Sequence, residues 1–224
     1  MTPLRRALLL VGSPKPARST SEALGAYLLE QLTHQGMLTD SLHVHRALRS
    51  DGAIEGLLAA VDRADLVVLA FPLYVDSLPA PVTRALELIA RHRQQAAGDP
   101  DTWLLAISNS GFPEPAQNDT ALAICRQFAR EAGFRWAGGL SVGGGGVIGG
   151  RPLARLGRLV RPVVQALDLS AAALAEERPV PEEAQELLSR PLVAPWLYRL
   201  VANFNFRREA RRSGAALRAR PHRP

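Results

Sequence analysis

The stretch ALLLVGSPKPARSTS, residues 7–21, decides the fold that this chain can adopt. Five consecutive apolar residues lead into a loop with four hydroxyl side chains, and a segment with helical periodicity follows. An apolar run of this length is typical of a strand that is buried on both faces. A strand, a polar loop and a helix in this order predict the first unit of an α/β fold.

The same alternation continues along the chain. Short apolar runs alternate with segments whose apolar residues recur every three or four positions, as Val82, Ala85, Leu86 and Ile89 do. Such alternation predicts a parallel sheet with helices on both of its faces. We expect strands at 6–12, 38–45, 65–71, 102–108 and 134–142, and helices at 19–35, 51–64, 81–95, 117–133 and 153–167.

The charge is distributed unevenly along the 224 residues, whose formal net charge is +6. The segment 207–224 holds seven arginines and a single acid, so the first 206 residues are neutral as a whole. The stretch 175–191 is rich in Glu and Pro, and an aromatic and then arginine-rich helix is expected at 195–213. We therefore expect a domain at 1–174 and, at 175–224, a linker with a basic aromatic helical extension.

Cysteine content and hydropathy limit the class of protein. A single cysteine excludes an internal disulfide framework and any four-cysteine metal or iron–sulfur site within one chain. Cys125 is expected to be buried in a helix rather than reactive. His43 and His45 share a face of an expected strand, but without a third ligand we expect no metal. The apolar run after Arg6 is too short for a signal peptide, so we expect a cytoplasmic protein.

The first loop, residues 12–21, has the chemistry of an anion site. In open α/β sheets ligands bind beyond the carboxyl ends of the strands, where this loop begins. Ser19 is expected to cap the next helix, with Glu22 completing a capping box. A cap needs one hydroxyl, whereas the loop has four, together with Lys15 and Arg18. This surplus favours a phosphate monoester as ligand.

Known nucleotide motifs do not fit the first loop. It matches neither G-x-G-x-x-G nor G-x-x-x-x-G-K-[ST], which argues against a standard dinucleotide site and a P-loop there. The stretch GGGVIG, residues 144–149, does match the first pattern, but it follows the fifth expected strand. It is therefore read as a close backbone approach or a flexible rim, with a dinucleotide turn as the weaker alternative.

Two further loops follow the third and fourth expected strands. The segment 72–81 is apolar and contains three prolines and a tyrosine, which suits the face of a planar ring. The segment 108–114 is small and polar and contains a glycine, which lets backbone approach a ligand closely. A phosphate cradle, an apolar wall and a polar edge together indicate a site for a mononucleotide with a large planar ring.

At these motifs the chain resembles the flavodoxin-like NADPH-dependent FMN reductases and NAD(P)H flavoprotein oxidoreductases. The matching stretches are GSPKPARSTSEAL, FPLYVDSLPAPVTRALELI and SNSGFPEPAQ, and the resemblance covers about residues 5–170. It implies a doubly wound sheet of order 2-1-3-4-5. It also implies that FMN contacts Ser13, Lys15, Ser19, Thr20 and Ser21 with its phosphate, Pro72, Leu73, Tyr74 and Val75 with its ring, and Asn109, Ser110, Gly111 and Phe112 with its polar edge or ribityl chain.

The resemblance also implies a function. Electrons would pass from NADPH or NADH through bound FMN to a quinone, a flavin or another small acceptor, without a catalytic side chain. The alternative is a flavodoxin-type electron carrier that a partner protein reduces. We expect a homodimer and no nucleic-acid partner, and peripheral membrane contact through the basic tail is not favoured. Many relatives have arginine where this chain has Lys15, which loses the bidentate fork.

Overall fold

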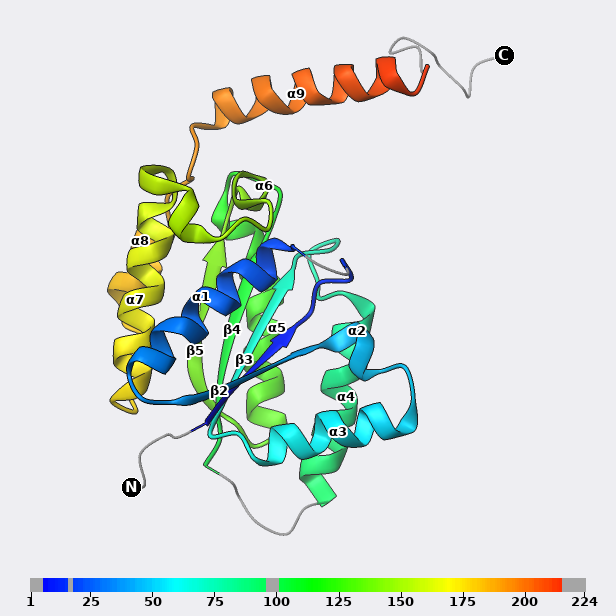
Figure 1. Cartoon of the computed structure of the whole chain (residues 1–224), viewed down its shortest axis with the longest axis vertical. Coiled ribbons are helices and arrows are strands. Elements are labelled where there is room, and N and C mark those ends of the chain that lie inside the picture. Colours follow the sequence, from blue (N-terminus) through cyan, green and yellow to red (C-terminus); the bar gives the residue numbers. More distant parts are fainter. Residues whose placement is uncertain (1–5, 16–17, 96–100, 215–224) are drawn as a thin grey trace. The chain divides into compact units, whose positions relative to one another are not determined.

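The structure is a computed structural model, and it describes residues 6–15, 18–95 and 101–214. At its centre lies a sheet of five parallel strands in the order β2-β1-β3-β4-β5 (Figure 1). This confirms the doubly wound, flavodoxin-like sheet expected above. The strands are β1 (Arg6–Val11), β2 (Leu38–His43), β3 (Leu66–Pro72), β4 (Trp103–Asn109) and β5 (Arg135–Val142).

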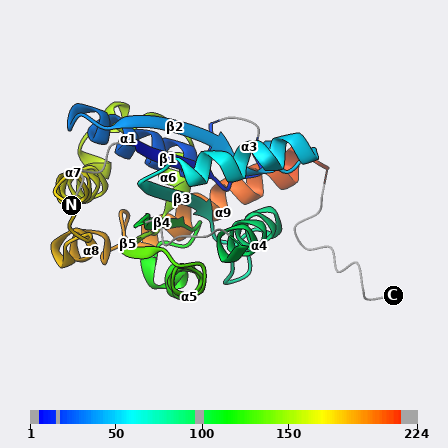
Figure 2. The same ribbon diagram turned by 90° about the horizontal axis from the view of Figure 1, so that it is seen from below.

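Helices cover both faces of the sheet (Figure 2). One face packs against α1 (Thr20–His34) and α7 (Arg161–Ala175), and the other against α3 (Asp51–Asp62), α4 (Ala80–Gln95) and α5 (Asp119–Glu131). The remaining helical segments are short or lie near the C-terminus. They are α2 (Val44–Ala47), η1 (Pro115–Asn118), α6 (Gly145–Ile148), η2 (Leu153–Arg155), η3 (Gly157–Val160), α8 (Glu182–Leu188) and α9 (Pro195–Arg212).

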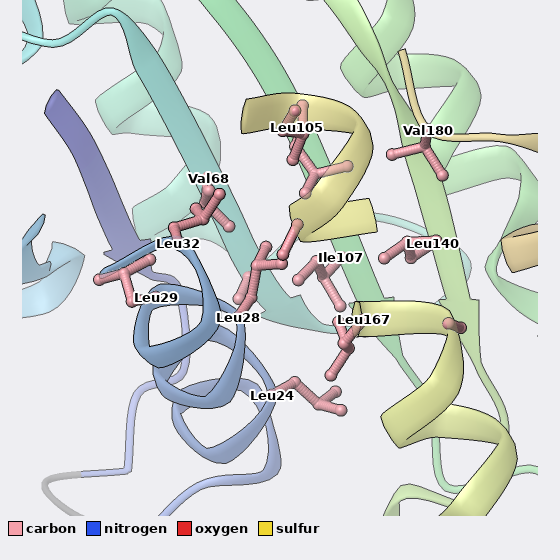
Figure 3. Packing of buried hydrophobic residues seen from close by; sticks show 14 of the residues in the cluster. Leu24, Leu28, Leu29, Leu32, Val68, Leu105, Ile107, Leu140, Leu167 and Val180 are labelled. Carbon is pink, nitrogen blue, oxygen red and sulfur yellow. The ribbon is translucent and has the colours of Figure 1, made fainter. Parts of the chain in front are cut away.

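Two apolar cores explain why the strands are apolar at successive positions. Leu9 of β1 belongs to the core under α1 and α7, whereas its neighbours Leu8 and Leu10 belong to the core on the opposite face. Figure 3 shows Leu24 and Leu28 of α1 lying over the first of these cores. Each fully buried leucine stabilises the fold by about 1.5–3 kcal/mol. Hydrophobic burial on both faces therefore holds the sheet, as the continuous apolar runs predicted.

The second strand is shorter than predicted. It ends at His43, and residues 44–47 form the helical turn α2 instead of continuing to His45. Val44 and Ala47, three positions apart, are both buried, as residues on one face of a helical turn are. The prediction that His43 and His45 share a strand face is therefore wrong, although their rings still lie 5.6 Å apart.

The helix predicted at 153–167 is also wrong in its position. Two short 3₁₀ segments, η2 and η3, precede α7, which begins only at Arg161. Gly157, the first residue of η3, has φ +57°, a left-handed conformation that an α-helix cannot contain. Pro162 lies in the first turn of α7, where its missing N–H costs no hydrogen bond.

Residues 175–192 pack with the sheet. The N–H of Val180 donates to the carbonyl of Ala137 in β5 at 2.8 Å, and α8 follows directly. By contacts the chain divides into one compact unit up to Leu192 and a second from Val193 onward. The boundary expected between residues 174 and 175 concerns where the flavodoxin-like core ends, and it stays a prediction.

The second unit contains α9, and its range confirms the helix expected at 195–213. Its side chains Trp196, Leu200 and Phe204 are exposed within the described part of the chain. The arginines of the tail at positions 218, 220 and 223 lie outside the described residues. Among the described helices, none is both long enough and apolar enough to cross a membrane.

A hydrogen bond between α1 and α7 predicts how stability depends on alkaline pH. The Tyr27 hydroxyl donates to Asp168 at 2.9 Å, and burial followed by this bond raises the pKa of Tyr27 to about 12. A folded-state pKa above the unfolded value stabilises the protein fully below the unfolded pKa, and this contribution is lost as pH rises toward the folded pKa. We expect stability to fall between about pH 10 and pH 12.

Urea denaturation across this range measures the effect. Tyr27→Phe removes the ionisable group, so its stability should fall less steeply than that of the wild type. Cys125 also contributes in the alkaline range because burial raises the pKa of its thiol to about 12, and Cys125→Ala serves as the comparison. Equal slopes for wild type and Tyr27→Phe would contradict the prediction.

Candidate flavin site

Four loops meet at the carboxyl edge of the sheet, and Asn109 joins three of the segments that carry them. Its side-chain amide, at the end of β4, donates to the Ser21 hydroxyl at 2.8 Å and to the Phe71 carbonyl at 2.9 Å. These partners lie in the first turn of α1 and near the end of β3. The Leu73 N–H in turn donates to the Asn109 carbonyl at 2.8 Å. The three loops predicted to bind one ligand are therefore adjacent.

The first loop turns into α1 through the predicted capping box. The Ser19 hydroxyl accepts the Glu22 N–H at 3.1 Å, and the Glu22 carboxylate accepts the Ser19 N–H at 3.4 Å. The N–H groups of Thr20 and Ser21 in the first turn have no acceptor within the helix, as at every helix start. These N–H groups lie at the N-terminus of α1, where the helix dipole is positive. Both features favour the binding of an anion at this loop.

The hydroxyls of this loop differ in what they can still donate. Ser13, Ser19 and Ser21 are buried, and each accepts an N–H in the described contacts, so each keeps its own proton for a ligand. Thr20 differs because its hydroxyl donates to the Gly145 carbonyl at 2.9 Å. Lys15 is exposed beside them. The donor set fits a phosphate, with Thr20 contributing its backbone N–H.

The second loop contains a strained tight turn. Tyr74 and Ser77 exchange two backbone hydrogen bonds of 3.0 and 3.1 Å around Val75 and Asp76, which have φ of +50° and +54°. Two positive φ angles define a type I′ turn, which favours Asn and Gly. Aspartate at position 76 is common in turns, whereas a β-branched valine such as Val75 disfavours this conformation. The Val75 side chain is 98% exposed, and that of Tyr74 is about half exposed.

Relief of this strain gives a stability prediction. Val75→Asn should raise the free energy of unfolding by about 1 kcal/mol, because a left-handed conformation costs an ordinary residue roughly 1–2 kcal/mol. Urea denaturation without flavin measures this difference. Asp76→Asn is the control, because aspartate already tolerates this conformation, and it should change little. A Val75→Asn protein no more stable than the wild type would refute the account.

Asn118 stabilises the third loop through side-chain hydrogen bonds, although the sequence analysis did not single it out. Its buried side chain accepts from the Ser108 hydroxyl at 2.8 Å and donates to the Pro115 carbonyl at 3.1 Å and the Ser141 hydroxyl at 3.0 Å. It thereby links β4, β5 and the start of η1. Among the predicted contacts of this loop, Ser110 is buried, and Gly111 and Phe112 are exposed.

The glycine-rich segment 143–150 closes over the first loop. A Cβ placed on Gly145 would lie 3.0 Å from the Ser110 carbonyl oxygen, and one on Gly150 would lie 1.7 Å from that of Arg18. The segment therefore contacts the first loop at Arg18 and the third loop at Ser110 through its backbone, which larger residues would prevent. The four-residue α6 lies within the G-x-G-x-x-G match, and only the short 3₁₀ segments η2 and η3 separate the match from α7. This agrees with a close backbone approach and not with the long helix of a dinucleotide fold.

Two histidines lie beside the first loop. His43 Nε2 lies 3.6 Å from a Glu22 oxygen, so the carboxylate of the capping box also faces β2. The pKa of His45 is lowered by burial and by the nearby His43, while a hydrogen bond to the backbone of Ser13 opposes this shift. Within the described residues, no group of three His, Cys, Asp or Glu side chains could hold a metal ion.

The fold and these loops define a flavodoxin-like α/β protein whose first loop carries the hydrogen-bond donors of an anion site. The family model of the NADPH-dependent FMN reductases matches residues 5–178. The chain therefore belongs to the NADPH-dependent FMN reductase family. It is an NAD(P)H-dependent oxidoreductase whose cofactor is FMN.

Solved structures of similar fold share little sequence with the chain. NADH:FMN oxidoreductase (EmoB) is 15% identical with a TM-score of 0.58, over 86% of this chain and 98% of that one. NAD(P)H:quinone oxidoreductase from Methanothermobacter marburgensis is 13% identical with a TM-score of 0.55, over 77% and 96%. A search of the curated proteins gives no match.

A third similar structure is a longer protein. It is rubredoxin oxygen:oxidoreductase from Desulfovibrio gigas, which is 14% identical with a TM-score of 0.56 over 78% of this chain. The chain spans only 36% of that protein's length. At these identities the structures show a shared fold, and family membership rests on the family model.

Proposed function

We propose that FMN binds across the first three loops, with its phosphate at Ser13, Lys15 and residues 19–21, its ring against residues 72–75, and its polar edge or ribityl chain at residues 109–112. The observation that carries this proposal is the convergence of these loops through Asn109, beside three serine hydroxyls that keep a proton to donate. The exposed side chains of Tyr74 and Phe112 offer apolar surface for the ring. Thr20 serves through its backbone N–H because its hydroxyl is engaged.

The bound flavin supplies the chemistry of accepting a hydride from NAD(P)H and passing the electrons on. The chain's own residues bind and orient it, and no side-chain acid or base is assigned to the reaction. The acceptor is a small molecule such as a quinone or a flavin. Two of the similar structures, an NADH:FMN oxidoreductase and an NAD(P)H:quinone oxidoreductase, support these two acceptor classes.

An electron carrier reduced by a partner protein is the second candidate. Carriers of the flavodoxin type are acidic as a rule, whereas the first 206 residues here are neutral and the tail is basic. The charge therefore favours a reductase with its own turnover. We further propose a cytoplasmic homodimer, which size-exclusion chromatography with light scattering tests directly.

The visible absorption spectrum tests the proposed function. The full chain is titrated with FMN, and NADPH or NADH is then added without oxygen. A bound flavin spectrum that bleaches within the mixing time supports the reductase. Binding without bleaching supports the carrier. A chain that leaves the FMN spectrum unchanged would overturn the proposed binding site.

A further inference from the structure

A cleft of about 570 Å³ runs along α1, outside the three loops. One wall of the cleft is formed by α1 and the other by the segment 150–155. The α1 residues that line it are Glu22, Ala23, Ala26, Tyr27 and Glu30. These two segments lie side by side in Figure 1. The volume is within the range of small-molecule sites, about 300–1,000 Å³. The cleft is therefore large enough for a nucleotide.

Three arginines give the cleft its charge. Arg18 lies at one end, next to the capping residue of α1, and Arg151 and Arg155 come from the opposite wall. Arg151 donates to the carbonyls of Ile148 and Val147, which fixes its position. In the described part of the chain, the exposed side chains of Arg18 and Arg155 have no hydrogen-bond or ion-pair partner. Both guanidinium groups are thus available to a ligand.

The acidic groups of the cleft do not cancel this charge. The Glu22 carboxylate already accepts the Ser19 N–H and faces His43. Tyr27 is neutral at physiological pH, as tyrosine ordinarily is, and burial raises its pKa further, to about 12. Glu30 is the remaining acid of the lining. The cleft therefore combines two available cations, an apolar floor of small side chains and one acceptor for hydroxyl or amino groups.

We propose that this cleft binds the adenosine end of NADPH, with Arg18 and Arg155 holding its 2′-phosphate. Guanidinium forks match the oxygens of a phosphate monoester and bind it more strongly than neutral donors do. Ala23, Ala26 and the Tyr27 ring offer apolar surface to the adenine. This inference rests on the proposed reductase function, and it makes NADPH rather than NADH the preferred electron donor.

Two adenosine nucleotides that differ only in the 2′-phosphate test the proposal without any electron transfer. Isothermal titration calorimetry compares 2′,5′-ADP with 5′-AMP on the full chain, without added flavin or NADPH. We expect 2′,5′-ADP to bind at least about tenfold more tightly, the effect of one hydrogen bond to a charged group. A smaller preference would overturn the proposal.

Charge reversal then locates the site. Arg155→Glu should abolish the preference for 2′,5′-ADP, whereas Arg126→Glu, an exposed arginine of α5 on the opposite face of the sheet, should keep it. A preference that survives in Arg155→Glu, or that is lost equally in Arg126→Glu, would overturn the assignment. FMN titration of the same samples separates the two hypotheses, because failure to bind FMN refutes the proposed function and not the cleft.

Discussion

Replacement of Arg93 by alanine should destabilise the protein by about 3 kcal/mol, the effect expected when buried, charge-assisted hydrogen bonds are removed. The Arg93 side chain is buried at the end of α4. It donates to the carbonyls of Ala132 and Gly133 at 2.7 and 2.8 Å and lies 3.9 Å from the centre of the Phe134 ring. Arg93 thus donates hydrogen bonds to two carbonyls just beyond the C-terminus of α5, where the helix itself has no N–H donor to offer.

Urea denaturation of Arg93→Ala and Arg91→Ala measures this contribution. Arg91 is an exposed arginine of the same helix, so its removal should change stability by less than about 0.5 kcal/mol. Arg93→Lys keeps the positive charge but loses the planar guanidinium that donates to both carbonyls at once. Its stability should lie between that of Arg93→Ala and the wild type. Equal stability of Arg93→Ala and Arg91→Ala would contradict the assigned role.

Replacement of Asn109 by alanine should weaken FMN binding by about tenfold or more, the usual cost of leaving buried hydrogen-bonding groups unpaired. The change removes the bonds to Ser21 and to the Phe71 carbonyl. Those bonds hold the end of β4 against α1 and β3. Without them the segments that carry the proposed phosphate and ring contacts are no longer fixed relative to one another, so binding must also order them.

Fluorescence titration with FMN, at a temperature where circular dichroism shows a folded chain, measures the effect. Asn205→Ala, the same chemical change at an exposed position of α9, is the control and should bind FMN like the wild type. Should Asn109→Ala fail to fold, Ser21→Ala removes one of the same bonds from the α1 side. FMN affinity within twofold of the wild type in a folded Asn109 or Ser21 variant would contradict the role.

The sheet and the capping box could be predicted because their signals are local. Burial on both faces makes β3 apolar at every position from Leu66 to Phe71, and the Ser19–Glu22 box is readable from four residues. Ser13, Ser19 and Ser21 lie where a phosphate loop would place them, and their role in binding stays a prediction.

The features that the sequence did not reveal depend on residues far apart in the chain. The bond from Asn109 to Ser21 spans 88 residues, and the bond from Thr20 to Gly145 spans 125. No periodicity encodes such pairs, so no local pattern indicates that the Thr20 hydroxyl is engaged. Val75 was missed for a different reason, because a β-branched residue argues against the left-handed conformation that it adopts. Similarly, the turn at α2 depends on tertiary burial of Val44 and Ala47.

The contact between Val180 and β5 has a consequence for how two copies of this chain can associate. An uncovered outer strand offers unpaired N–H and C=O groups to a neighbouring molecule and is a common route to fibrous aggregation. Here the Val180 N–H donates a hydrogen bond to the Ala137 carbonyl, and α8 lies against the same strand. A continuous ten-stranded sheet through paired β5 strands is thereby blocked, so the proposed homodimer must use helices, loops or the β2 side of the molecule.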